Sequence, residues 1–475
     1  MTMNPGAVNF RAGDGQPARK ILAATSISYA IVLLDASIVN IGLEQIGATL
    51  DSGVSGLQWI VNAYTLSFAS FLMTGGTLGD RLGARNIYLA GLMLFTLASA
   101  LCGFAPNLGT LAMARALQGL GSAMLVPCSL ALINQAYPDP ARRAAAIGMW
   151  MGCGGIAMAS GPLLGGLLIH GFGWRSIFFV NLPLGLAGIC LTWPLPRDRA
   201  PGTRHFDIAG QLTAIIALGS LIALLIEAPA LGWGSLPIVA GAVVCGMASL
   251  LFIRIETRQP QPMLPLSLFR NGLFAASALV SMASALVFYG MLFAFSIYYQ
   301  RVLGYAPLQA GLAFLPMTVM VATGGLVSGR LARLFGARAS MCAAFCLYAI
   351  GAAGMLLPEP GSPYWFAVLP MLAIGLASGF ISPAATAPAM GTVEKNRAGI
   401  AAAVLNSARQ TGAALGVAIF GALLATLQPF AQALHIVLGM VVAISLAAAL
   451  LWWFSTRPSA CLQRVQARSK NAALR

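Results

Sequence analysis

Charge is what this chain has least of. Only 8% of its 475 residues are charged, 59% are hydrophobic, and just 12 are Asp or Glu. A soluble globular domain carries roughly 25% charged residues, so a soluble fold is excluded. The apolar residues form long uninterrupted runs rather than short alternating ones. This pattern excludes a membrane β-barrel and favours helices that cross a membrane.

Other absences exclude whole classes of function. The eight cysteines show no CxxC spacing and seven lie in apolar runs, so neither a disulfide framework nor a zinc site is indicated. No P-loop pattern occurs, so we expect no nucleotide hydrolysis. The net charge of +15 comes from short basic clusters between the apolar runs, which is how membrane proteins mark their cytoplasmic side. We therefore expect no enzyme activity, no metal, no organic cofactor and no nucleic-acid partner.

Fourteen apolar runs approach the roughly 20 residues that a helix needs to cross a bilayer. The predicted spans are 21–43, 57–78, 86–104, 110–132, 144–169, 177–195, 208–226, 236–253, 273–299, 308–328, 340–357, 365–387, 398–425 and 434–455. If both termini are cytoplasmic, 23 of the 27 Lys and Arg residues lie in inner loops, inner helix ends or the tails. One missed span would scramble this asymmetry, so it supports an even number of spans in a bacterial cytoplasmic membrane.

A short repeat relates the two parts of the chain. The segment GTLGDRLGAR at 76–85 follows the second span, and GRLARLFGAR at 329–338 follows the tenth, with five of ten positions identical. The alternative is chance similarity between two basic turns. The equal helix counts favour two six-helix bundles, at 21–196 and 271–456.

Two inserted spans in 197–270 separate these bundles, and polar tails at 1–20 and 457–475 are expected in the cytoplasm. The predicted fold is thus an all-α membrane protein with fourteen spans. Two parallel repeats that face one central site are the architecture of alternating access.

Asp35 is the only carboxylate placed deep in a predicted span. A helix rises about 1.5 Å per residue, which puts Asp35 about 22 Å and Arg115, in the fourth span, roughly 20 Å from the inner face. An acid and a base at similar depth can neutralise each other, and an unpaired charge in hydrocarbon is costly. The pair either binds and releases protons as its separation and hydration change, or is a static tie between two helices.

Four motifs in order resemble the major facilitator superfamily. The decapeptide 76–85 resembles its loop between helices two and three, although Ala84 replaces the usual Arg. RALQGLG at 115–121 resembles the fourth-helix motif R-x-x-q-G-x-g, and SGPLLGG at 160–166 resembles the G-P-x-x-G-G antiporter motif. LDASIVN at 34–40 resembles the first-helix pattern of drug exporters. With fourteen spans, the chain resembles the fourteen-helix drug:proton antiporter family.

Within that family the segments 174–183, 225–233 and 405–412 are similar to methylenomycin A resistance proteins. This resemblance does not fix a substrate. It does imply that Asp35 and Arg115 couple transport to protons in a cavity lined by the first and fourth helices.

The resemblance also implies a cytoplasmic gate made by Asp80, Arg81, Gly83 and Arg85, with Asp80 docking on the start of the thirteenth helix. A solvated turn charge is the alternative for Asp80.

In the fifth span, Gly161, Pro162, Gly165 and Gly166 form a bare, kinkable face. We expect this face to form a contact between the halves that seals when the cytoplasmic side closes. Ordinary packing of small residues is the alternative for any single glycine.

Six further residues are candidates to line the cavity: Asn40, Tyr64, Phe68, Gln118, Tyr289 and Arg409. Arg409 lies about 18 Å deep and has no evident carboxylate partner. It either faces the cavity, where it binds anions or tunes Asp35, or it binds the carbonyls of a broken helix. Trp59, Tyr298 and Tyr299 are favoured as interfacial belt residues instead.

The sequence therefore predicts a monomeric inner-membrane antiporter that exports a small organic toxicant or antibiotic in exchange for protons. An exporter or exchanger of a native metabolite is the nearest alternative. A membrane scaffold or receptor that transports nothing is a more distant one.

Overall fold

The computed structural model describes residues 15–195, 207–260, 262–357, 362–394 and 397–456, and over these residues its regular structure is entirely helical. The C-terminal tail, most of the N-terminal tail and the loop at 196–206 lie outside the described residues.

The helices follow the predicted spans closely. The first half contains α1 (Gly15–Thr49), α2 (Val54–Leu82), α3 (Ala84–Gly103), α4 (Leu108–Ala136), α5 (Pro140–Phe172), α6 (Ser176–Phe179) and α7 (Asn181–Thr192). The inserted pair is α8 (Ile208–Leu231) and α9 (Leu236–Arg258). The second half contains η1 (Leu266–Arg270), α10 (Gly272–Ile297), η2 (Tyr298–Val302), α11 (Pro307–Ala313), α12 (Leu315–Phe335), α13 (Ala337–Gly354), α14 (Trp365–Gly391), α15 (Ala398–Thr426) and α16 (Phe430–Ser455). The sixth span is thus divided into α6 and α7, and the tenth into α11 and α12.

Twelve of the described helical segments are long and apolar enough to cross a membrane. The sixth predicted span, 177–195, corresponds to an apolar but shorter helical segment at 176–192. The second, α2, has 29 residues but is less apolar, because it carries polar side chains such as Gln58 and Asn62. Both of these side chains are fully buried, so the polarity of α2 faces the protein interior rather than lipid.

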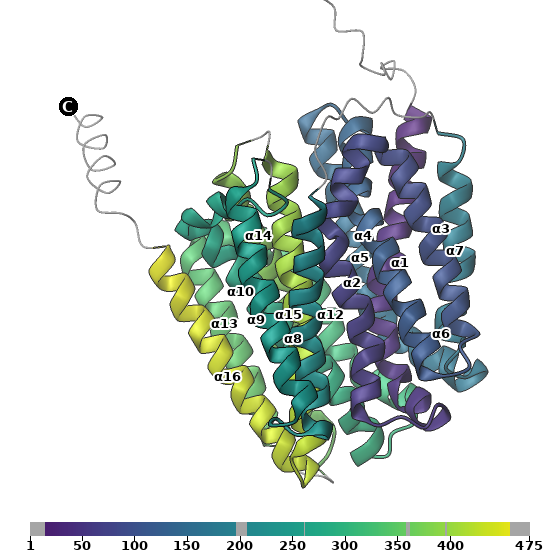
Figure 1. Ribbon diagram of the computed structural model, residues 1–475, viewed down its shortest axis with the longest axis vertical. Helices are drawn as coiled ribbons and strands as arrows, with labels where there is room; N and C mark the ends of the chain where they lie inside the picture. Colours follow the sequence, from purple (N-terminus) through teal and green to yellow (C-terminus); the bar gives the residue numbers. More distant parts are fainter. Residues whose placement is uncertain (1–14, 196–206, 261, 358–361, 395–396, 457–475) are drawn as a thin grey trace, which may run out of the picture.

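The two halves repeat the same helix pairings. In the first half α1 packs on α5, α2 on α4, and α3 on both α4 and α7; in the second α10 packs on α15, α12 on α14, and α13 on both α14 and α16. The halves lie side by side (Figure 1). Gly83 and Gly336 make the turns that follow α2 and α12, with φ of 93° and 80°. Positive φ favours glycine, which explains why both copies of the decapeptide keep this residue.

The halves are joined at the end of the molecule that carries Glu44, here called the Glu44 end. Arg301 of η2 donates through Nε to both carboxylate oxygens of Glu44, at 2.9 Å each. Gln58 of α2 donates through Nε2 to the carbonyl oxygens of Val417 (3.0 Å) and Ala418 (2.8 Å) in α15. These bonds run from one half to the other and hold this end closed.

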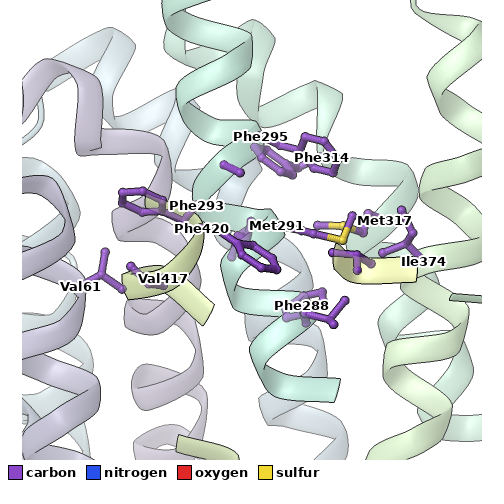
Figure 2. Packing of buried hydrophobic residues seen from close by; sticks show 14 of the residues in the cluster. Val61, Phe288, Met291, Phe293, Phe295, Phe314, Met317, Ile374, Val417 and Phe420 are labelled. Atoms are coloured by element: carbon purple, nitrogen blue, oxygen red, sulfur yellow. The ribbon is translucent and has the colours of Figure 1, made fainter. Parts of the chain in front are cut away.

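An apolar core continues across the same junction. Val61 of α2 belongs to one cluster with Val417 and Phe420 of α15 and with Phe293 of α10 (Figure 2). Each of these side chains is at most 6% exposed. Because apolar burial is non-directional and proportional to area, this contact stabilises the closed end without fixing a single geometry.

Two aromatic residues correct the prediction of an interfacial belt. Tyr298 is 9% exposed and Tyr299 only 2%. Both belong to η2, a π-helical turn that continues α10 and directs them into the core, where Tyr299 stacks on Tyr305 at 5.7 Å between ring centroids. Trp59 is half-buried and donates through Nε1 to Oε1 of Glu227 at 2.6 Å, which ties α2 to α8.

At the opposite end, which carries Asp80, a cavity of about 880 Å³ lies between the halves. Its walls come from α2, α4 and α5 on one side and from α14 and α15 on the other, with residues 260, 262, 263, 265 and 267 at its rim. We call this the Asp80 end. The structure therefore shows one conformation, closed at the Glu44 end and hollow at the Asp80 end.

Close glycine contacts set the spacing of the helices, and one of them gives a test. A Cβ placed on Gly379 of α14 would lie 1.9 Å from the carbonyl oxygen of Val321 in α12. We expect Gly379→Ala to lower the thermal unfolding midpoint of the purified protein, because the two helix backbones must separate. Gly439→Ala, in open space on α16, should leave the midpoint unchanged or slightly higher. Equal midpoints for the two variants would contradict this packing.

Candidate functional site

A buried ion pair lies inside the first half of the protein. Arg115 of α4 donates through Nη1 to Oδ2 of Asp35 in α1. The Asp35 side chain is 0% exposed and that of Arg115 is 1% exposed. The structure thus brings together the acid and the base that the depth argument places at the same level.

Amide side chains satisfy the other oxygen of Asp35. Oδ1 accepts from Nδ2 of Asn181 at 3.0 Å and from Nε2 of Gln118 at 3.2 Å. Both amides also reach Oγ of Ser99, at 3.4 Å and 2.7 Å respectively. The four helices α1, α3, α4 and α7 therefore meet at one carboxylate, and each oxygen of that carboxylate has a donor.

Arg115 has partners on every side. Its Nε donates to the carbonyl oxygen of Ile60 at 3.2 Å, and Nη1 also donates to Oε1 of Gln118 at 2.8 Å. The guanidinium carbon lies 4.3 Å from the ring centroid of Tyr64 and 5.9 Å from that of Phe178. Aromatic faces attract cations, so these rings stabilise the buried charge. Removing one member of a buried pair typically costs about 3–5 kcal/mol, because the other charge is left uncompensated.

The pair is separated from the cavity, which differs from the expectation that helices one and four bring it there. The residues that line the cavity include none from α1, and those from α4 lie at 126–134. Arg115 is three turns earlier in α4, toward the Glu44 end. In this conformation a proton reaches Asp35 only if the surrounding helices move.

None of the six predicted cavity residues is among those that line the cavity, and four of them are buried elsewhere. Tyr64, Phe68 and Gln118 are at most 4% exposed and pack inside the first half. Asn40 is 2% exposed, and its carbonyl oxygen accepts from Ser296 of α10 at the junction of the halves. None of the four lines the cavity, because α1, α2 and α4 turn these faces toward one another.

Arg409 lies between the halves and is half-buried. Its Nη1 donates to Oγ of Ser382 and its Nη2 to Oδ1 of Asn406, and Asn406 itself lines the cavity. The hydroxyls of Tyr29 and Tyr289, one from each half, are within electrostatic reach of this guanidinium. Among the described residues no carboxylate forms an ion pair with Arg409. These partners are side-chain oxygens rather than backbone carbonyls, and Arg409 itself is not among the residues that line the cavity.

The last turns of α2 lie at the rim of the cavity. Asp80 is exposed and lines the cavity together with Arg397 and the first residues of α15, so the two parts of the expected latch share one cavity. Arg81 is exposed as well. Arg85 is buried and donates to the carbonyl oxygen of Trp193, just beyond α7. A cation at a helix C-terminus is favourable, so Arg85 fastens α3 to α7 within the first half.

The antiporter-motif glycines face two different neighbours. Gly161 and Gly165 pack on α1, whereas a Cβ on Gly166 would lie 2.8 Å from the backbone of Leu308 in α11, in the other half. The carbonyl oxygen of Pro162 lies 2.3 Å from a Cβ placed on Gly311 of α11. We expected this face to seal when the cytoplasmic side closes. The structure instead forms the contact while the Asp80 end is hollow, because the motif lies roughly 30 Å along α5 from that end.

Ser99 and Asn181 are site residues that the sequence analysis did not single out. Neither carries a charge, and nothing in its own span distinguishes Ser99 from other small polar residues. The signal for Asn181 was its position at the end of an aromatic segment directly before Leu182 and Pro183, where α6 ends and α7 begins.

A helical membrane protein with two similar halves, a cavity between them and a buried charge pair in one half has the architecture of an alternating-access transporter. The family model of the Major Facilitator Superfamily matches residues 25–417. The chain belongs to this superfamily. Its members are multi-pass membrane transporters rather than enzymes, and they need no cofactor.

Relatives and solved structures support the assignment. The chain is 35% identical over 437 residues to the methylenomycin A resistance protein of Bacillus subtilis (strain 168). The aligned region covers 91% of this chain and 94% of that protein. It is 36% identical over 417 residues to the multidrug resistance protein Stp of Mycobacterium tuberculosis (strain CDC 1551 / Oshkosh), covering 86% and 77%. A bacterial homologue of the human lysosomal transporter Spinster shares the fold, with a TM-score of 0.63, 17% identity and coverage of 93% and 98%.

The contact at Gly166 gives a test of the closed end. Gly166→Leu should open the Glu44 end, because the side chain would collide with the α11 backbone. We expect a Ser296→Cys reporter, buried at the junction in this conformation, to be alkylated about tenfold faster in Gly166→Leu, which corresponds to a shift of ~1.4 kcal/mol between conformations. The background should lack the other reactive cysteines.

Gly155→Leu is the matched control, because it lies on the same helix with nothing within 4 Å of its Cβ position. It should leave the alkylation rate unchanged. If Gly166→Leu and Gly155→Leu give the same rate, Gly166 does not hold the Glu44 end closed.

Proposed function

We propose that this protein exports small organic toxicants or antibiotics across the bacterial cytoplasmic membrane in exchange for protons. The observation that carries the proposal is the isolated Asp35–Arg115 pair, buried within the first half of a transporter fold. An ionisable pair at membrane depth marks a proton or ion pathway. Relatives named for resistance to methylenomycin A and to multiple drugs support an organic substrate.

In the proposed cycle the described conformation is open to the cytoplasm. The basic residues assign the Asp80 end to the cytoplasmic side, so the cavity there receives substrate. Opening of the Glu44 end would let water approach Asp35, which then takes up a proton and weakens its bond to Arg115. During the return toward the inward-open form the helices around Asp35 move again, so the proton leaves toward the cytoplasmic side before the pair re-forms and is enclosed. The membrane potential supplies about 2.3 kcal/mol per charge for each 100 mV, and the pH gradient adds to it.

Two sets of contacts would gate this cycle. At the Glu44 end the gate consists of the Glu44–Arg301 pair and the contact of Gly166 with α11. At the Asp80 end it would form when Asp80 docks on the start of α15 and the cavity disappears. In this proposal each gate closes only when the other is open. Substrate and protons are then exchanged and cannot pass straight through the protein.

Arg409 is proposed as a substrate contact. It is half-buried between the halves, its charge has no carboxylate partner among the described residues, and its neighbour Asn406 lines the cavity. The tyrosines at 29 and 289 add hydroxyl groups and aromatic faces from both halves. Such a site suits an organic molecule that carries an acidic group.

Asp35→Asn tests the coupling. The amide keeps the size of the carboxylate and one acceptor oxygen but cannot release a proton. In proteoliposomes with an imposed pH gradient we expect gradient-driven efflux to be lost, while substrate counterflow, which needs no net proton movement, persists.

Glu227→Gln, which removes a carboxylate in α8, should retain gradient-driven efflux. Undiminished gradient-driven efflux in Asp35→Asn would overturn the coupling role. A panel of metabolites and drugs in the same vesicles distinguishes a drug exporter from a metabolite exchanger, and no flux of any compound would favour a receptor or scaffold.

Arg409→Gln tests the substrate contact. Loss of a charge-assisted hydrogen bond costs about 1.5–3 kcal/mol, so we expect the KM for acidic substrates to rise at least about tenfold. Arg409→Lys should retain most of the affinity, and uncharged substrates should be little affected by either change. Unchanged efflux kinetics for all substrates in Arg409→Gln would show that the guanidinium does not contact them.

A further inference from the structure

A pair of carboxylates lies in the inserted helices, far along the chain from Asp35. Asp207 is the N-cap of α8 and lines the cavity at the Asp80 end. Glu256 belongs to the last turn of α9 and is 3% exposed. The predicted span ended at 253 and left Glu256 in a loop, so its burial is visible only in the structure.

In each carboxylate one oxygen has donors. Oδ1 of Asp207 accepts from the backbone N of Gly210 at 2.8 Å and from Nε2 of Gln259 at 3.0 Å. Oε2 of Glu256 accepts from the backbone N of Leu264 at 3.0 Å. These bonds fix the orientation of both side chains.

The remaining oxygens are buried and lack donors. Oδ2 of Asp207 and Oε1 of Glu256 have no hydrogen-bond partner in the part of the chain that the structure describes. A Cβ placed on Gly210 would lie 2.5 Å from the first and 2.8 Å from the second. Both orphaned oxygens therefore border the space beside Gly210, at most 5.3 Å apart (2.5 Å plus 2.8 Å), and a side chain at Gly210 would collide with both.

No cation compensates the two acids among the described residues. Arg254 and Arg258 are on α9 but exposed, and neither forms an ion pair with Glu256 or Asp207. On the α2 side, the groups that face α8 here are the uncharged Ser70 and Thr74, both bonded to Gln211. Across the cavity the charged groups are Asp80 of α2 and Arg397 at the start of α15.

We propose that Asp207 and Glu256 form a proton-binding site that holds one proton between Oδ2 and Oε1. Two carboxylates that share a buried site do not both ionise, because their charges repel and neither is solvated. One proton turns the two orphaned oxygens into a donor and an acceptor. A bound metal ion would need further ligands, and the described residues contain no group of three or more His, Cys, Asp or Glu side chains that could hold one.

This proton joins the start of α8 to the end of α9 beside the cavity. Gln211, one turn into α8, donates to the carbonyl oxygen of Ser70 and accepts from Thr74 in α2. Loss of the proton leaves two adjacent negative charges, which push α9 away from α8 at the cavity rim. The site therefore senses pH on the cavity side, independently of Asp35 and of the proposed transport reaction.

Infrared spectroscopy of the full-length protein across a pH series tests the proposal, through the C=O stretch of a protonated carboxyl group. In the wild type we expect a band that disappears with a midpoint at least one pH unit above the ordinary carboxyl value of about 4. Glu256→Gln should abolish this band. Asp207→Asn should move its midpoint to lower pH by about one unit or more, because the neighbouring charge is gone.

Asp35→Asn and Glu227→Gln serve as controls, since both remove a carboxylate elsewhere and should leave the band in place. A wild-type midpoint near 4 would overturn the proposal. So would a band that survives both Glu256→Gln and Asp207→Asn, or one that disappears in Asp35→Asn alone. Circular dichroism of each variant shows that the helices are retained.

Discussion

The ion pair between Asp35 and Arg115 is the constraint on which the first half of this protein depends. A carboxylate at this depth is tolerable only with a counter-charge and a donor for each oxygen, and the structure supplies both. To do so, α1, α3, α4 and α7 must converge on one point, with the α2 backbone behind Arg115. The same network that neutralises the charge therefore fixes how these helices pack. Breaking this ion pair would therefore disturb the packing of several helices at once.

Close backbone contacts explain how the halves can move without unfolding. Helices in lipid gain little from the hydrophobic effect, so they pack through small residues that allow near approach. Gly379 of α14 packs against α12 and Gly161 of α5 packs against α1, each within one half, while Gly166 of α5 meets α11 across the junction. The first kind of contact keeps each bundle rigid. The second kind, between the halves, must separate if the Glu44 end opens.

The inserted helices α8 and α9 are more than a spacer. Trp59 and Glu227 bond α2 to α8 at the Glu44 end, and Gln211 bonds α8 to α2 near the cavity. Both ends of the inserted pair are thus attached to a helix that lines the cavity. Asp207 and Glu256 lie at the cavity end of this pair, and Asp207 lines the cavity.

The sequence by itself determined the helical membrane fold, the fourteen segments and the Asp35–Arg115 pairing. Hydropathy, the distribution of basic residues and helix rise are local properties that need no knowledge of packing. Only the tertiary structure decided which face each helix turns inward. It enclosed Asp35 away from the cavity and brought Asn181 into hydrogen-bond contact with Asp35. It also placed Asp207 beside Glu256, although the two are far apart in sequence. Contacts of this kind depend on the rotation of each helix about its axis, and in a nearly uniform apolar helix the sequence pattern does not fix that rotation.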